Sequence, residues 1–151
     1  MLAIKTILCP TDFSEPSFEA LKYATDLATL FGADLCLTNV VPVIPPLPTN
    51  PNFVFEIPEY ERGLHADADG KLRESVEQRV PKGLKVRTVI GHGDAGGEIV
   101  RIAEDERADL IVMATTGTTG LRHFLFGSVA EKVVRLSTCP VLTVRGPLGR
   151  T

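Results

Sequence analysis

Residues 109–145 read DLIVMATTGTTGLRHFLFGSVAEKVVRLSTCPVLTVR and contain two apolar runs on either side of a helical pattern. The short apolar run DLIVMA predicts a buried strand, and VLTVR, which follows Pro140, predicts a second one. Between them, SVAEKVVRLS (128–137) predicts a helix. Two strands joined through a helix need a crossover connection, so this stretch predicts a parallel βαβ arrangement.

The same alternation of strands and helices continues toward the N-terminus. In the first helix, Ser14 is the expected N-cap and Gly32 the expected stop. Apolar residues at helical spacing form its expected core-facing stripe: Phe18, Leu21, Leu27, Ala28 and Phe31. Further strands are expected in 3–10, 35–43 and 84–91, and further helices in 59–80 and 96–107. The sequence therefore predicts one α/β domain over 1–151, a three-layer open sheet of five mostly parallel strands with helices on both faces.

Composition limits the class of partner. The 151 residues are 44% apolar and 23% charged, with a formal net charge of −3. Sixteen basic residues against nineteen acidic ones give no basic footprint for nucleic acid or for an anionic membrane. The three cysteines, Cys9, Cys36 and Cys139, form no CxxC pair, which indicates a reducing compartment and predicts core positions.

An uncharged stretch from Leu35 to Phe55 is long enough to span a bilayer, but it contains five prolines. A lipid-exposed helix does not tolerate them together, so we expect no membrane segment and a cytoplasmic protein. From about 43 to 58 the prolines predict a surface loop without regular structure, and residues 146–151 form a C-terminal tail.

The segment that follows DLIVMA has the features of an anion site. In open α/β sheets ligands bind outside the carboxyl ends of the strands, and glycines and a helix start let main-chain amides approach a phosphate. The segment contains no lysine before Lys132, so amides and hydroxyls would hold the phosphate, with Arg122 or His123 as optional charge. The glycines are Gly117, Gly120 and Gly127, and the hydroxyls are Thr115, Thr116, Thr118, Thr119 and Ser128. Alternatively, Ser128 and Glu131 form a capping box, which explains the Gly-Ser pair without a ligand.

This segment resembles the nucleotide-binding signature of the universal stress protein family, G-2x-G-9x-G-(S/T). Gly117, nine intervening residues, Gly127 and Ser128 match it, whereas the first glycine of the pattern falls on Ala114. The resemblance extends from Ile4 to Val144 and includes the opening KTILCPTDFSEPSFEAL and the closing FGSVAEKVVRLSTCPVLTVR.

The resemblance implies a sheet of order 3-2-1-4-5 and an adenine nucleotide, ATP or AMP with Mg²⁺ as an accompanying ion, across the ends of strands one and four. It also implies a homodimer that pairs through the last strand, Val141 to Arg145. Carried over by position, Pro10, Asp12 and Val40 line the adenine and ribose, Met113 and Ala114 border the sugar, and Gly117, Gly127, Ser128 and Val129 meet the phosphates.

Two of these positions have a second interpretation. Asp12, at the end of the first strand, can accept hydrogen bonds from adenine or ribose, or it can form an Asx turn or cap the first helix. The methyl group of Ala114 is costly if this position needs a positive φ or touches the sugar.

A second glycine motif, GHGDAG (91–96), is a literal GxGxxG after a strand and before a helix. A dinucleotide site would place an acidic residue about twenty positions on, at the end of the next strand. That strand ends in Met113-Ala114-Thr115, so the motif favours a turn with Asp94 as the helix cap. His65, Asp67, Asp69 and Gly70 imitate the start of a calcium loop, but the terminal Glu falls on Val76.

Three functions remain at this stage. The leading one is a non-catalytic adenine-nucleotide-binding stress protein that responds to stress or energy state. The alternative is a regulatory dimer of the same fold that binds no nucleotide and acts through protein partners, and Ala114 favours it. The third is a slow ATPase or phosphotransferase with Asp12 or a loop threonine as acceptor, although no tuned base stands beside the phosphates.

Overall fold

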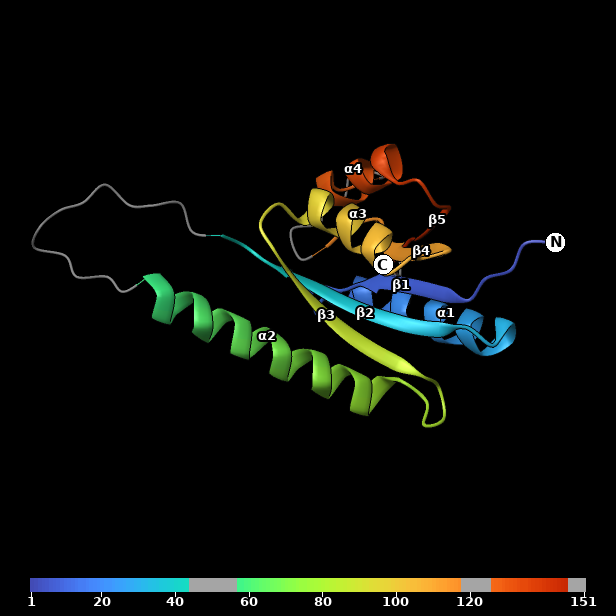
Figure 1. Ribbon diagram of the computed structural model, residues 1–151, viewed down its shortest axis with the longest axis horizontal. Helices are drawn as coiled ribbons and strands as arrows, with labels where there is room; N and C mark the ends of the chain where they lie inside the picture. The colour runs from blue at the N-terminus through green and yellow to red at the C-terminus, as the bar shows by residue number, and fades with distance from the viewer. Residues whose placement is uncertain (44–56, 118–125, 147–151) are drawn as a thin grey trace, which may run out of the picture.

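The computed structural model describes residues 1–43, 57–117 and 126–146, and these form a five-stranded sheet with four helices (Figure 1). Every strand pairing is parallel, and the strand order is β3-β2-β1-β4-β5, as the resemblance implied. The elements are β1 (Thr6–Pro10), α1 (Glu15–Phe31), β2 (Asp34–Val41), α2 (Ile57–Arg79), β3 (Val86–His92), α3 (Ala95–Asp105), β4 (Leu110–Ala114), α4 (Ser128–Leu136) and β5 (Val141–Val144).

Helices cover both faces of the sheet, which confirms the predicted three-layer arrangement. Buried residues of α1 and α2 pack with one set of strand side chains, among them Ile7, Leu35 and Val112. Buried residues of α3 and α4 pack with the opposite set, among them Leu8 and Ile111. Because successive strand residues point to opposite faces, these neighbouring residues divide between the two cores.

Helix α1 begins and ends at the predicted residues. The Ser14 hydroxyl accepts a hydrogen bond from Ser17 N–H at 3.4 Å, and Gly32 closes the helix in the left-handed conformation with φ 65°. Leu21 and Ala28 are buried, but Phe31 is 46% exposed. The prediction that Phe31 belongs to the core stripe is therefore wrong, because it is the last residue of α1 and the chain turns away directly after it.

Several predicted features lie outside the described residues. They are the proline-rich segment from 44 to 56, the loop positions Thr118, Thr119, Gly120, Arg122 and His123, and the tail from 147 to 151. The predicted loop boundary at 58 falls inside α2, which begins at Ile57. No helix in the described part of the chain combines the length and the apolar character needed to cross a membrane.

Candidate functional site

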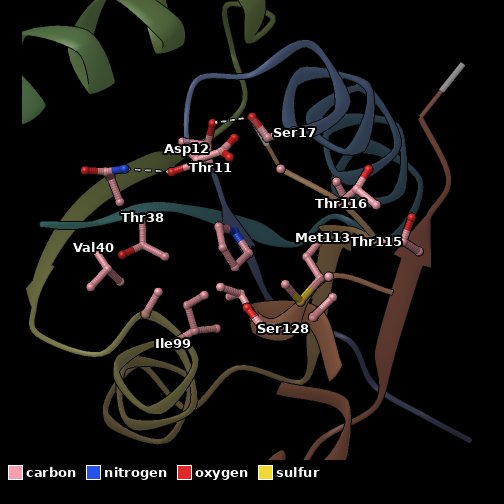
Figure 2. A pocket seen from close by; sticks show the side chains of 18 residues that line it. Thr11, Asp12, Ser17, Thr38, Val40, Ile99, Met113, Thr115, Thr116 and Ser128 are labelled. Atoms are coloured by element: carbon pink, nitrogen blue, oxygen red, sulfur yellow. Dashed lines mark hydrogen bonds between the residues drawn. The ribbon is translucent and has the colours of Figure 1, made fainter. Parts of the chain in front are cut away.

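A cavity of about 270 Å³ lies at the carboxyl ends of the central strands (Figure 2). Its walls come from the ends of β1, β2 and β4 and from the first turns of α3 and α4. The structure brings together at this cavity all the residues that the resemblance singled out: Pro10, Asp12, Val40, Met113, Ala114, Gly117, Gly127, Ser128 and Val129.

The cavity also has lining residues that sequence reasoning missed. Thr11, Ser17, Thr38 and Asn39 add polar groups, and Ala95, Ile99 and Ala130 add apolar surface. The start of α3 could have been found, because it follows a strand end at the same edge of the sheet as β1 and β4. The buried hydroxyls gave no comparable signal, since isolated threonines in strands are ordinary core-edge residues.

The turn after β1 is fixed by side-chain hydrogen bonds. The Thr11 hydroxyl accepts from Phe13 N–H at 3.0 Å and shares a 2.8 Å hydrogen bond with the Ser17 hydroxyl (Figure 2). Asp12 Oδ1 accepts from Ser14 N–H at 3.1 Å and from the Ser14 hydroxyl, which is the Asx turn considered for this residue. Phe13 has φ 65°, an uncommon value for a residue with a side chain, and these bonds hold it there.

The end of β2 directs main-chain groups into the cavity. Thr11 N–H donates to Thr38 C=O on the β1 side, whereas Gly93 N–H donates to Val41 C=O on the β3 side. Since residues of a strand face alternate neighbours, Val40 N–H and C=O face the β1 side. The last β1–β2 pair is Pro10 with Thr38, so β1 has already ended at this level. The Thr11 C=O, which follows the end of β1, accepts instead from the Asn39 side chain at 2.8 Å. The main-chain N–H and C=O of Val40 therefore face the side on which the cavity lies.

Helix α4 begins at Ser128, as predicted, but its cap differs from the capping box considered for that residue. Gly127 is its N-cap residue, no side chain makes a capping hydrogen bond, and Ser128 is the first helical residue. The predicted capping box of Ser128 and Glu131 is therefore wrong, because the cap position lies one residue earlier, on a glycine. Gly127 N–H donates to Thr115 C=O at 2.7 Å and ties the helix start to the end of β4. Ser128 and Val129 come next and line the cavity. The main-chain amides in this part of the cavity wall therefore belong to a helix start without a side-chain cap.

Ala114 has an ordinary strand conformation. It is the last residue of β4, pairs with Val144 and is 9% exposed. Among the described non-glycine residues, positive φ values occur at Phe13 and Arg107 and not at Ala114. The backbone at this position therefore does not require glycine.

The GxGxxG segment has packing explanations. A Cβ on Gly91 would lie 2.9 Å from Ile102 Cδ1, and one on Gly96 would lie 2.8 Å from Lys132 Cδ. Asp94 is the N-cap residue of α3 and accepts from Gly97 N–H at 2.9 Å, which confirms the predicted turn and cap.

The described part of the cavity wall contains few ionisable side chains. Among its described lining residues, Asp12 is the only one with an ionisable side chain. Just outside, Lys132 Nζ contacts Asp94 Oδ2 at 2.6 Å. The Lys132 ammonium, with the Gly97 N–H, lowers the pKa of the Asp94 carboxyl below its ordinary value. The pocket itself can thus bind through hydrogen bonds and main-chain dipoles, with little formal charge.

His65, Asp67 and Asp69 of α2 and His92 of β3 are not among the residues that line the cavity. His65 stacks on His92 with ring centroids 5.3 Å apart, and the two rings share a hydrogen bond of 3.3 Å. Asp67 and Asp69, which imitated a calcium loop, form ion pairs with Lys71 and Arg73 one turn further along α2.

The fold defines a doubly wound α/β protein, with the cavity at the carboxyl ends of the strands where the strand order reverses. Within that class the chain belongs to the universal stress protein family, because the model of the Universal stress protein family matches residues 3–145. Universal stress protein MJ0531 of Methanocaldococcus jannaschii is 41% identical over 145 residues, which cover 95% of this chain and 83% of that protein.

Universal stress protein MJ0577 of the same organism is 34% identical, and the match covers 93% of this chain and 94% of that protein. A solved structure of MJ0577 superposes with a TM-score of 0.79, covering 95% of this chain and 96% of that one. A universal stress protein in complex with cAMP (TM-score 0.60, 23% identity) covers 94% of this chain and 97% of its own. The structure of the universal stress protein from Archaeoglobus fulgidus in complex with dAMP has a TM-score of 0.56 and 20% identity. The match covers 95% of this chain and 98% of that one. Both of these complexes share the fold.

Proposed function

We propose that this protein binds an adenine nucleotide, ATP or AMP, in the cavity between β1, β2 and β4 and acts as a regulator that responds to stress or energy state. The observation that carries the proposal is that two sets of main-chain polar groups meet at one cavity. Val40 N–H and C=O stand on one wall, and the uncapped start of α4 stands on another.

The Val40 groups favour adenine. A strand end offers an N–H donor and a C=O acceptor side by side, and the Watson–Crick edge of adenine offers the matching N1 acceptor and N6 amino donor. Guanine presents an N1–H donor and an O6 acceptor in the corresponding places, so each would face a like group. Pro10, Ile99 and Met113 supply the apolar surface against which a base would pack.

The α4 start favours a phosphate. Gly127 presents no side chain there, and the helix dipole adds a favourable potential for an anion. Thr115, Thr116 and Ser128 add hydroxyls at the same cavity. Asp12, in the turn after β1, lines the same cavity, and in this proposal its carboxylate accepts from ribose hydroxyls. With no cation among the described lining residues, Mg²⁺ would supply the counter-charge that a triphosphate needs.

The relatives agree with this ligand class. Universal stress proteins of the same fold are known with cAMP and with dAMP, so adenine nucleotides have a precedent in the fold. We further propose that the protein works in the cytoplasm as a homodimer joined through β5, whose outer edge has no neighbouring strand among the described residues. A binding role is favoured over a catalytic one because Asp12 is the sole ionisable side chain among the described lining residues.

Thermal unfolding with different nucleotides tests the proposal. ATP and AMP at about 100 times their dissociation constant are expected to stabilise the fold by roughly 2.7 kcal/mol, and GTP by much less.

The matched variant is Gly127→Val. A Cβ at Gly127 would lie 3.3 Å from Thr115 O, so a branched side chain forces the helix start to shift. Gly127→Val is expected to show no rise in melting temperature with AMP, while its oligomeric mass stays unchanged. Unchanged melting of the wild-type protein in millimolar ATP and AMP, with no adenine carried through purification, would refute nucleotide binding and leave the alternative of a regulator that acts through protein partners.

A further inference from the structure

The N-cap of α3 and the second turn of α4 are joined by an ion pair whose two residues are close in sequence to residues of the cavity wall. Lys132 Nζ of α4 donates to Asp94 Oδ2 at 2.6 Å. The same oxygen accepts from Gly97 N–H at 2.9 Å, so Asp94 caps α3 and binds α4 at once.

The aliphatic part of Lys132 passes close to the backbone at the start of α3. A Cβ on Gly96 would lie 2.8 Å from Cδ of Lys132 and 3.0 Å from its Cβ and Cγ, so the lysine stem crosses the bare backbone of α3. A Cβ on Gly97 would lie 3.1 Å from Asp94 Oδ2. Glycines at 96 and 97 therefore leave the space in which the two helix starts meet.

Both partners adjoin residues of the cavity wall. Asp94 immediately precedes Ala95, and Lys132 lies one helical turn after Ser128; Ala95 and Ser128 both line the cavity. A change in the Asp94–Lys132 contact is therefore expected to move the first amides of α4 relative to the rest of the pocket.

We propose that Asp94 and Lys132 are a positioning pair, which holds the start of α4 so that its amides meet the phosphate of the bound nucleotide. This inference rests on the proposed function. Lys132 acts here through the geometry of α4 and not as a cation for the phosphate, because its ammonium group is paired with Asp94.

Two single variants separate positioning from simple attraction. Asp94→Asn keeps a good N-cap residue but leaves Lys132 positive, whereas Lys132→Met keeps the stem but leaves Asp94 negative. If the pair positions α4, both variants weaken AMP binding about threefold to fivefold, and the double variant is no worse than either single one. If only charge matters, Asp94→Asn binds AMP more tightly and Lys132→Met more weakly, and that result would overturn the inference.

Isothermal titration with AMP and with adenosine provides the readout. Adenosine affinity is expected to stay unchanged in both variants, because only the phosphate meets α4. Arg135→Met is the matched control: it removes a cation from the same helix, and among the described residues Arg135 pairs with Glu131 of α4 at 3.5 Å. It is expected to leave AMP affinity unchanged.

Relaxation measurements on the unliganded proteins keep the two proposals apart. The ¹⁵N order parameters of Ser128 and Val129 are expected to fall in Asp94→Asn and Lys132→Met but not in Arg135→Met. If wild-type protein binds no AMP and these order parameters still fall, nucleotide binding is refuted and the positioning of α4 stands. If they do not change, the positioning pair is refuted whatever the protein binds.

Discussion

Gly117 and Asp12 meet at the mouth of the cavity so closely that a Cβ on Gly117 would overlap Oδ2 of Asp12 and lie 3.5 Å from its Cγ. They belong to the turns that follow β4 and β1, the two central strands of the sheet. The glycine thus permits a close approach of two loops, and through it the position of the Asp12 carboxylate depends on the loop after β4.

Replacing Gly117 with alanine is therefore expected to displace Asp12. Because the atom in the way is the end of a side chain, unfolding stability should change by less than about 1 kcal/mol. Affinity for AMP and for adenosine should both fall about tenfold, or about 1.4 kcal/mol, since ribose recognition is lost. Titration calorimetry measures both. Gly63→Ala, in an open position of α2, is the control and should leave affinity unchanged; full retention of adenosine affinity in Gly117→Ala would remove Asp12 from the ribose site.

The Asp94 carboxyl predicts a pH-dependent contribution to stability. The Lys132 ammonium and the Gly97 N–H lower its folded-state pKa below the ordinary value of 3.8. A lowered pKa contributes stability above the unfolded value, and that contribution is lost as the pH falls through the folded one. Wild-type protein should exceed Asp94→Asn in stability at pH 7, with the difference shrinking as the pH falls from about 5 to 3. Urea unfolding at several pH values measures it, and a difference independent of pH would contradict the assignment.

The three cysteines are expected to differ in thiol reactivity. Burial raises the pKa of Cys9 to about 12, and burial together with the nearby Glu106 charge raises that of Cys36 to about 12. Cys139 is only partly buried. At pH 8, an aromatic disulfide reagent is expected to modify one thiol per native chain and three in denaturant. Cys139→Ser should abolish the native reaction; rapid labelling of a second native thiol would show that the sheet opens locally.

The proposed dimer makes a prediction about one amide of β5. Ile111 N–H donates to Pro140 C=O and Thr115 N–H to Val144 C=O, so the intervening Thr143 N–H faces the outer edge of the sheet. Thr143→Pro removes that donor without breaking the ladder with β4. Light scattering should show a dimer for the wild-type protein and for Thr143→Val, and a monomer for Thr143→Pro. A wild-type monomer would exclude pairing through β5.

Sequence patterns predicted the elements and their ends where local chemistry decides them. Ser14, Gly32 and Asp94 act through hydrogen bonds or backbone conformations confined to a few neighbouring residues, and all three were found. The alternation of strands and helices predicted parallel pairing, whereas the strand order 3-2-1-4-5 followed from the family resemblance.

Features that depend on distant segments could not be predicted. The Gly-Ser sequence at 127–128 is compatible with a cap on either residue, and contact of Gly127 with Thr115 decides between them. Val40 was named from the resemblance, but the exposure of its main-chain groups depends on where the neighbouring strand β1 ends. Phe31 fitted the helical period, yet a period says nothing about how far the sheet extends beside it.

The orientation of the Val40 main chain also affects how far the cavity tolerates substitutions at this position. Its two polar groups belong to the peptide backbone, so nearly any codon change at this position leaves them in place, proline excepted. Because the Val40 side chain also lines the cavity and packs against the core, a saturation library at residue 40 should retain ligand binding for apolar residues of similar size, whereas at Gly127 every exchange introduces new atoms.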